Sequence, residues 1–312
     1  MSIPAVSVLV VSYRVKDLLR RCLETLRAQR GVEFDVWVLD NDSGDGSADM
    51  VETTFPECHL VRSGENLGFA RANNRLIDRA QGRLLALVNP DTELPPDALA
   101  VAVEVLGRHP GAAVAGLALR NTDGTPQLSC FAFPDPLNLL VESLGLHRAL
   151  VHAGFATPSA APEPRHGEGS VPWVSGAFFV MRREAVERVG ALDEGQLMYG
   201  EEMDWCWRAR RAGFDVVWSD RARVLHHGGA SGRDARGALF VKNLEGRMTF
   251  LRRHRGGFAA AFGLELMTLA AAIRLPYWRW RAARDGTGAS EWTRDQVERF
   301  EAVLAWRRGM KG

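Results

Sequence analysis

Acidic side chains and a histidine stand where predicted strands end or a predicted helix begins. Asp91 follows the apolar run 84–88 and a turn that contains Asn89 and Pro90. Proline cannot continue a β-ladder, so the strand must end there. An aspartate at the carboxyl end of a central strand, in a turn with an asparagine, suits a divalent cation that carries a diphosphate. An Asn-Pro-Asp turn that binds no ligand would explain the same residues. The choice between a cation site and a simple turn therefore depends on the other candidate residues.

Asp40 ends a second predicted strand, 34–39, and is expected at the same sheet edge as Asp91. An acid at this position can accept hydrogen bonds from a ribose or a base, although Asp40 could also be a simple turn former. The first strand, 6–11, leads into Ser12 and Tyr13 without a Gly-x-Gly-x-x-Gly sequence. That absence argues against a nicotinamide or flavin enzyme.

Two predicted helix starts also carry charge. Arg71 lies in the first turn of a helix that follows a strand at 58–61, and a helix amino terminus with an arginine is an anion site. Glu201, Glu202 and Asp204 open a later helix, where ordinary capping explains acids as well as chemistry does. A carboxylate partly buried beside Trp205 could serve as a general base. The alternative for Arg71 is a solvated helix face.

The elements that position these residues alternate between strand and helix from Val6 to Leu119, which predicts βαβ units and a mainly parallel sheet. Residues 121–172 are rich in proline and are predicted as a lid, a binding loop or an insertion. His226 ends the last strand, where its imidazole could act near neutral pH or be merely structural. The later predicted elements are a strand at 173–180, helices at 182–189 and from 199 to near 213, and strands at 215–218 and 222–225.

Bulk composition excludes several classes of protein. The chain of 312 residues can form one large or two small domains, and its net charge of +1 gives no overall attraction to nucleic acid. Its cysteines, Cys22, Cys58, Cys130 and Cys206, are scattered rather than paired. This spacing argues against a zinc site or a disulfide framework and fits a reducing compartment, so we expect a cytoplasmic protein.

Taken in order, the motifs resemble those of family 2 glycosyltransferases with the GT-A fold, and they look closest to the bacterial rhamnosyltransferase-like branch. The resemblance covers Val6 to about Ser231, some two thirds of the chain. It implies an α/β fold, Rossmann-like, with a mainly parallel central sheet flanked by helices. The matching segments are 11–13, 40–47, 65–70, 73–74, 87–92, 175–177, 192–194, 199–204 and 226–231.

The resemblance also implies a role for each matching position. Asp91 and His226 would hold Mg²⁺ or Mn²⁺, and Glu202 would be the catalytic base, in a place where the family has aspartate. Asn89 replaces the first acid of the family's metal motif, and Leu76 replaces a frequent glycine. The implied donor-binding residues are Ser12, Tyr13, Asp40, Asn41, Asn66, Gly68, Arg71, Asn74 and Asn89. The implied acceptor-side residues are Ser175, Gly176, Glu201, Asp204 and Trp205.

The implied activity is an inverting transfer of a sugar from a nucleotide-diphosphate donor, with dTDP-rhamnose or a UDP-sugar favoured. The acceptor would be a saccharide or a lipid-linked glycan in cell-surface polysaccharide synthesis. One alternative is a nucleotidyltransferase on a related sheet, but this class needs a glycine-rich loop after the first strand, and residues 12–16 contain no glycine. The other alternative is a non-catalytic nucleotide-sugar-binding protein, against which the acids Asp91 and Glu202 speak.

We expect a catalytic domain at 1–235 and a helical extension at 236–312. The domain would comprise a nucleotide-sugar half (1–120), the loop 121–172 and an acceptor half (173–235). From Arg252 onward the extension holds 12 Lys or Arg against 6 Asp or Glu.

Within this extension the segment 258–273 is apolar, but at sixteen residues it is too short to span a bilayer comfortably. Residues 274–281, which follow it, mix arginine with Trp and Tyr. This pattern predicts a region that lies peripherally on the inner face of the plasma membrane. The alternatives are helices packed on the catalytic domain or a homodimer contact.

Overall fold

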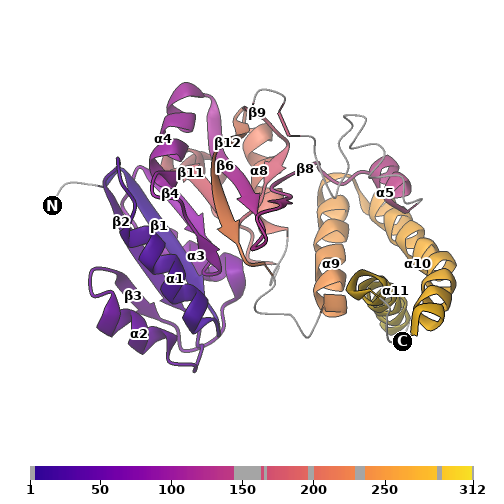
Figure 1. Ribbon diagram of the computed structural model, residues 1–312. Coiled ribbons are helices and arrows are strands. Elements are labelled where there is room, and N and C mark those ends of the chain that lie inside the picture. The colour runs from indigo at the N-terminus through magenta and orange to yellow at the C-terminus, as the bar shows by residue number, and fades with distance from the viewer. Residues whose placement is uncertain are drawn as a thin grey trace. The chain divides into compact units, whose positions relative to one another are not determined.

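The computed structural model describes residues 4–143, 163–164, 167–195, 200–228, 236–286 and 290–310. The described residues form two compact units (Figure 1). The first draws on the stretches 1–133, 160–197 and 201–231, and the second on 134–159, 198–200 and 232–312. Residues 134–143, inside the predicted loop 121–172, therefore belong with the C-terminal helices.

The first unit is built on a ten-stranded sheet with the order β3-β2-β1-β4-β11-β6-β12-β5, in which β7 pairs with β6 and β9 with β12. Its strands are β1 (Val6–Ser12), β2 (Phe34–Asp40), β3 (His59–Arg62), β4 (Leu84–Val88), β5 (Thr92–Glu93), β6 (Ala112–Arg120), β7 (Pro126–Gln127), β9 (Glu168–Ser170), β11 (Phe178–Arg182) and β12 (Asp215–His226). The helices of this unit are α1 (Lys16–Arg27), α2 (Ser47–Thr54), α3 (Gly68–Ile77), α4 (Ala98–Arg108), α7 (Arg183–Val189) and α8 (Glu201–Arg211).

The prediction of an α/β fold with a mainly parallel central sheet is confirmed. Strands β3, β2, β1 and β4 pair in parallel, as do β6 and β12. Strand β11 runs antiparallel between β4 and β6. Its amino end consequently lies at the same sheet edge as the carboxyl ends of the parallel strands, and the Asn89 amide donates to the Ala177 carbonyl at 3.0 Å.

Four predicted elements differ from the structure. The predicted strand 173–180 is divided into β10 (Trp173–Val174) and β11, because the chain leaves β8 (Cys130–Phe131) and joins the main sheet after Gly176. The predicted strands 215–218 and 222–225 are one strand, β12, whose register against β6 shifts between Ser219 and Arg223. The predicted loop 121–172 contains β7, β8 and β9 in its described part.

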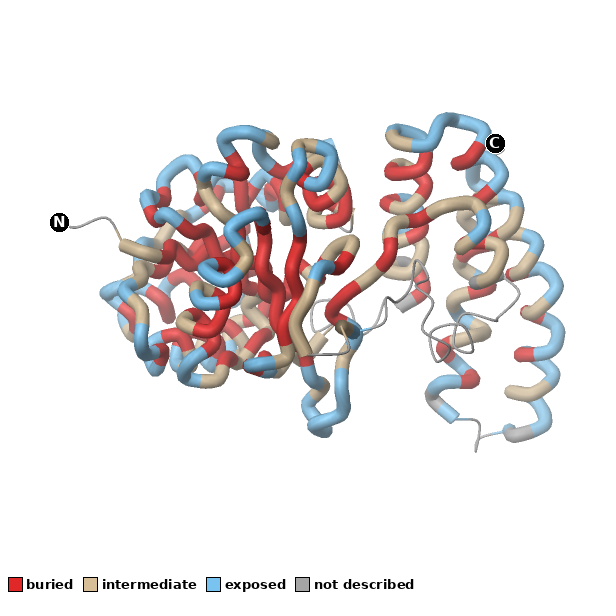
Figure 2. The backbone as a smooth tube through the Cα atoms, turned by 90° about the horizontal axis from the view of Figure 1, so that it is seen from above, coloured by how far each residue is buried: buried red, intermediate tan, exposed pale blue. Residues whose placement is uncertain are grey.

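The main core lies where α1 and α4 pack on the sheet. The central strand β4 is buried along its whole length, as its uninterrupted apolar sequence predicts. Figure 2 shows the buried residues gathered in the middle of the first unit. Leu19 and Leu23 of α1 and Ala102 and Val105 of α4 pack against these strands as one cluster. Burying each of the larger side chains contributes about 1.5–3 kcal/mol, so the sheet is a rigid base for residues at its edge.

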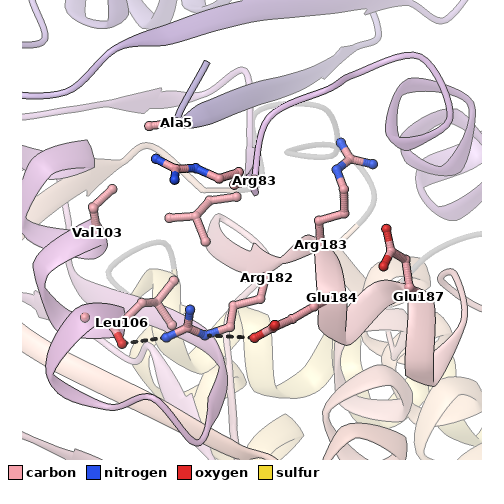
Figure 3. A pocket seen from close by; sticks show the side chains of 10 residues that line it. Ala5, Arg83, Val103, Leu106, Arg182, Arg183, Glu184 and Glu187 are labelled. Atoms are coloured by element: carbon pink, nitrogen blue, oxygen red, sulfur yellow. Dashed lines mark hydrogen bonds and ion pairs between the residues drawn. The ribbon is translucent and has the colours of Figure 1, made fainter. Parts of the chain in front are cut away.

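A cavity of about 510 Å³ lies at the sheet edge where β4 begins and β11 ends (Figure 3). This edge is opposite to the one that carries Asp91. Arg182 donates from its wall to the Leu106 carbonyl at 2.6 Å, and Arg183 donates to the Ala80 carbonyl at 2.8 Å. Both guanidinium groups thus hold main-chain carbonyls. The two arginines therefore stabilise the packing between neighbouring elements, and we do not assign a ligand site to this cavity.

The second unit contains α5 (Pro136–Ser143), α9 (Arg236–His254), α10 (Gly257–Asp285) and α11 (Glu291–Gly309), which share a separate apolar core. Helix α10 is much longer than the predicted apolar segment of sixteen residues, because it continues through Pro276. By length and composition, Gly257–Arg284 could cross a membrane, although 33% of its most apolar window is buried. The apolar segment of sixteen residues is thus part of a longer helix, and its own length does not limit the length of that helix.

Candidate active site

The turn that carries Asp91 is held from several sides. The Asn89 carbonyl accepts hydrogen bonds from the Thr92 amide at 3.2 Å and the Thr92 hydroxyl at 2.7 Å. The His227 amide donates to the Asp91 carbonyl at 2.9 Å. Beneath the turn, burial raises the pKa of the Cys22 thiol to about 12, so this thiol stays protonated. The turn is thus a fixed platform for the Asp91 carboxylate.

The structure brings the side chains of Asp91 and His226 together, and their role as cation ligands stays a prediction. Asp91 Oδ1 lies 3.3 Å from His226 Nε2, and the two side chains are 12% and 16% exposed. Neighbouring ligand atoms of an octahedral Mg²⁺ with bonds of about 2.1 Å are about 3 Å apart, so the pair fits a divalent cation. Within the described ranges no group of three or more His, Cys, Asp or Glu side chains could hold a metal. Two protein ligands are still sufficient where substrate phosphates complete the coordination.

The predicted nucleotide side of the site begins at the ends of β1 and β2, where Ser12 and Asp40 are register partners. Ser12 is 0% and Asp40 7% exposed. Ser12 Oγ and Asp40 Oδ1 have no hydrogen-bond partner among the residues that the structure describes. Buried polar atoms are normally paired, so these two atoms are suited to a polar ligand at the sheet edge. Tyr13 follows, with the Arg14 guanidinium 5.0 Å from its ring centre.

Asn41 and Asn66 organise the start of α3. Asn41 Oδ1 accepts from the Leu67 amide at 2.8 Å, and Asn41 Nδ2 donates to Asn66 Oδ1 at 2.9 Å. Gly68 has φ of 74°, which favours glycine. Arg71 is exposed in the first turn of the helix, 3.9 Å from Glu65. The asparagines therefore position the helix start, and Arg71 remains predicted as the phosphate contact.

Glu202, predicted as the base, lies beside the chain that enters β11. Its Oε1 accepts a 3.4 Å hydrogen bond from the Gly176 amide. A Cβ atom at position 176 would lie 3.4 Å from this oxygen and 3.6 Å from the Phe69 ring, so Gly176 leaves space for both side chains. Ser175 Oγ accepts from the Ala177 amide at 3.3 Å. Since Ala177 also bonds Asn89, this segment links Glu202 to the Asp91 turn.

Several other predicted site residues are engaged in the fold. Asp204 accepts a 2.7 Å hydrogen bond from Arg208, and Trp205 is fully buried and donates to the Gly190 carbonyl at 2.8 Å. Asn74 exchanges hydrogen bonds with the main chain of Leu192 at 2.9 and 3.0 Å. These contacts fix α3, α7 and α8 relative to one another. They are structural contacts, so the donor role of Asn74 and the acceptor roles of Asp204 and Trp205 remain predictions, as does that of Glu201, which is also buried.

Gln127 is a site residue that sequence reasoning missed. It belongs to β7, inside the predicted loop, and its Oε1 lies 2.7 Å from His226 Nδ1. The signal was the Asp123-Gly124 pair, which is typical of a hairpin turn and would have placed a returning strand beside β6. The motif residues Tyr199 and 229–231 lie outside the described residues.

A mixed sheet with mostly parallel strands and acids at one edge is the arrangement of GT-A glycosyltransferases, and solved structures agree. The mannosyltransferase PcManGT from Pyrobaculum calidifontis, solved with GDP-Man and Mn²⁺, has a TM-score of 0.61 at 18% identity, covering 99% of this chain and 87% of that one. GalNAc-T7, solved with UDP, GalNAc and Mn²⁺, has a TM-score of 0.56 at 15% identity over 80% of this chain and 48% of that one. These likenesses establish the fold.

The chain belongs to glycosyltransferase family 2, because the sequence model described as "Glycosyl transferase family 2" matches residues 7–190. Among curated relatives, the N-acetylglucosaminyl-diphospho-decaprenol L-rhamnosyltransferase of Mycobacterium tuberculosis is 28% identical over 270 residues, 81% of this chain and 86% of the relative. The low-salt glycan biosynthesis hexosyltransferase Agl10 of Haloferax volcanii is 24% identical over 71% of this chain and 66% of that protein. The predicted rhamnosyltransferase-like family membership is confirmed.

Proposed function

We propose that this glycosyltransferase transfers a sugar, with inversion, from a nucleotide-diphosphate donor to a lipid-linked or saccharide acceptor of cell-surface polysaccharide synthesis. The observation that carries the proposal is the pair Asp91–His226, whose ligand atoms lie 3.3 Å apart at the carboxyl edge of the sheet. Asp91 and His226 would hold Mg²⁺ or Mn²⁺ there. Bound in this place, the cation would supply positive charge that stabilises the departing diphosphate.

The remaining residues would orient and activate the reactants. Ser12 Oγ would donate or accept a hydrogen bond with the nucleoside, Asp40 Oδ1 would accept one from it, and Arg71 would contact a phosphate. Glu202 would take the proton from the acceptor hydroxyl, whose oxygen forms the new bond to the anomeric carbon as the bond to the donor phosphate breaks. Attack from the face opposite the leaving group inverts the anomeric centre.

The donor that we favour is dTDP-rhamnose, with UDP-sugars next. The support is the similarity to an L-rhamnosyltransferase over 81% of this chain. The same relative acts, by its name, on a diphospho-decaprenol glycan, which favours a lipid-linked acceptor for this chain.

Incubation with a panel of nucleotide sugars and Mn²⁺ or Mg²⁺ tests the activity. We expect release of nucleoside diphosphate from a preferred donor, and we expect EDTA to abolish it. Release of pyrophosphate instead would indicate a nucleotidyltransferase. A protein that binds donors but turns over none of them with any acceptor would be a binding protein, and the proposal would fail.

We also propose that the protein is cytoplasmic and works peripherally at the inner face of the membrane. One side of α10 packs in the helical core through Met267, Ala271 and Leu275, so lipid cannot surround this helix. The opposite side exposes an apolar stripe whose members are three, four or seven positions apart and so share one helix face. The exposed stripe consists of Phe258, Phe262, Leu269, Ile273, Tyr277 and Trp280.

Charge near the exposed stripe supports a lipid surface as its partner. The Arg284 guanidinium lies 5.1 Å from the Trp280 ring centre, at the end of the stripe. Aromatic side chains prefer the headgroup level, and each arginine near an anionic leaflet contributes about 1 kcal/mol. A helix with one packed face and one apolar face bordered by arginine is suited to lie in the interface plane rather than to cross it.

Flotation with liposomes tests this surface. We expect the full chain to float with vesicles rich in anionic lipid at low salt, less so at high salt, and not with neutral vesicles. The double substitution Ile273→Glu and Trp280→Glu should remove flotation, whereas Ala305→Glu, at an exposed position of α11, should not. If the double variant floats as well as Ala305→Glu does, the proposal is contradicted. A wild-type dimer in light scattering that the double substitution dissociates would assign the exposed stripe to a homodimer contact instead.

A further inference from the structure

We propose that Gln127 is a positioning residue that fixes the tautomer of His226. In this assignment the amide oxygen of Gln127 holds the proton on His226 Nδ1 and leaves the lone pair of Nε2 directed at Asp91. The inference rests on the proposed cation-binding role of His226 and goes beyond it, because it names the side chain that prepares the imidazole. It follows from a chain of hydrogen bonds in which each donor is fixed by the next acceptor.

The series of hydrogen bonds begins at Asn121, which follows β6 and lies beside the hairpin turn. Asn121 Nδ2 lies 3.0 Å from Thr125 Oγ1 and 3.4 Å from the Pro126 carbonyl, which can only accept. The Thr125 hydroxyl itself donates to Asp123 Oδ1 at 2.6 Å, so its oxygen is an acceptor toward Asn121. These contacts place the amide nitrogen of Asn121 toward Thr125 and its amide oxygen toward Gln127.

The orientation of the Gln127 amide follows. Gln127 Nε2 lies 2.9 Å from Asn121 Oδ1 and 3.3 Å from the His226 carbonyl, and both of these oxygens are acceptors. The end of Gln127 that faces them must therefore be the NH₂ group. Its oxygen, which has no proton to give, faces His226 Nδ1 at 2.7 Å. An acceptor at this distance requires Nδ1 to carry a proton.

The tautomer of a neutral imidazole is set by this bond. With the proton on Nδ1, Nε2 presents a lone pair to Asp91 Oδ1 at 3.3 Å. A lone pair and a carboxylate that face each other repel unless a cation lies between them. Histidine ligands of metals commonly donate their other ring N–H to such an outer acceptor, which orients the ring and favours coordination.

Loss of the Gln127 oxygen would reverse the arrangement. Without an acceptor at Nδ1, the neutral ring gains more by placing its proton on Nε2, where Asp91 Oδ1 accepts it. In this tautomer Nε2 has no lone pair for a cation, and the Asp91 carboxylate is occupied by an N–H donor. A substitution 99 residues away in sequence would thus weaken cation binding while both proposed ligands, Asp91 and His226, stay unchanged.

Long-range ¹H–¹⁵N correlation spectra of the ¹⁵N-histidine-labelled full chain test the assignment. The spectra are recorded without metal, about two pH units above the ordinary imidazole pKa of ~6.5, and His226 is assigned by the loss of its signals in His226→Ala. We expect the Nδ1–H tautomer in the wild type. In Gln127→Leu we expect the Nε2–H tautomer.

Titration of Mn²⁺ followed by electron paramagnetic resonance, alone and with UDP or dTDP, supplies a second measurement. We expect Gln127→Leu to weaken Mn²⁺ binding about 10–100-fold. A wild type with the Nε2–H tautomer, or a Gln127→Leu variant that keeps the Nδ1–H form, overturns the inference. If Mn²⁺ binds the wild type and His226→Ala equally, the proposed cation role of His226 fails instead, and the spectra still decide the tautomer.

Discussion

Replacing Glu202 by glutamine is expected to remove sugar transfer while donor binding stays close to that of the wild type. Glutamine keeps the size of the side chain and can still accept the 3.4 Å hydrogen bond from the Gly176 amide, but it cannot take a proton from the acceptor hydroxyl. Loss of a general base costs about 10²–10⁴-fold in rate, which corresponds to about 2.7–5.5 kcal/mol of transition-state stabilisation. Single-turnover transfer rates and the donor Kd measure the two effects separately.

Neighbouring acids on α8 provide the controls for this prediction. Asp204→Asn removes a carboxylate that holds Arg208 at 2.7 Å, so its expected effect is a lower unfolding temperature rather than a slower chemical step. Glu201→Gln changes a side chain that is buried one position away. If Glu202→Gln transfers sugar at nearly the wild-type rate while one of these variants does not, the role of base belongs to that other residue.

Replacing Asp91 by asparagine is expected to weaken donor binding that depends on the cation. The substitution removes the only negative charge of the proposed pair and leaves a neutral amide oxygen 3.3 Å from His226. Removal of an outer partner of a metal ligand typically costs 10–100-fold in affinity, so loss of the ligand itself should raise the Kd for Mn²⁺ by at least about that factor. Calorimetric titration of Mn²⁺ and donor into the variant measures it.

Glu93→Gln is the matched control for Asp91→Asn. Glu93 lies two residues further along the chain, and its Oε1 is 2.8 Å from His227 Nε2 rather than from His226. Both substitutions remove one negative charge from the same region, so a general electrostatic effect would weaken Mn²⁺ binding in both variants. We expect the loss in Asp91→Asn alone. Normal binding of donor and metal by Asp91→Asn would exclude Asp91 as a ligand.

The sequence by itself determined the element order and the edge at which polar residues gather. Continuous apolar runs, such as Leu84–Val88, gave the central strands because such runs are buried on both faces. Pro90 fixed the end of β4, and the alternation of strands and helices gave a mainly parallel sheet. These features are local, since each depends on residues within one strand, turn or helix.

Contacts between distant segments were decided only by the tertiary structure. Strand β11 enters the sheet antiparallel, and nothing in its own apolar sequence distinguishes this direction. In the sequence, Asn74 is a candidate for binding the donor. In the structure, its side-chain amide exchanges hydrogen bonds with the main chain of Leu192, 118 positions away. An amide serves a substrate or a backbone equally well, so its role depends on which partner the fold presents.

The proposed cation site shows the same division. Their positions at strand ends made Asp91 and His226 candidates, because carboxyl ends of parallel strands meet at one edge, and the resemblance to the family implied that the two residues share a cation. Gln127 was not predicted, since its importance arises only when the β6–β7 hairpin returns it to His226. The sequence therefore determined which side chains reach this edge, and the tertiary structure decided which partner orients each of them. Hydrogen bonding depends on distances and directions that residue spacing does not encode across a hundred positions.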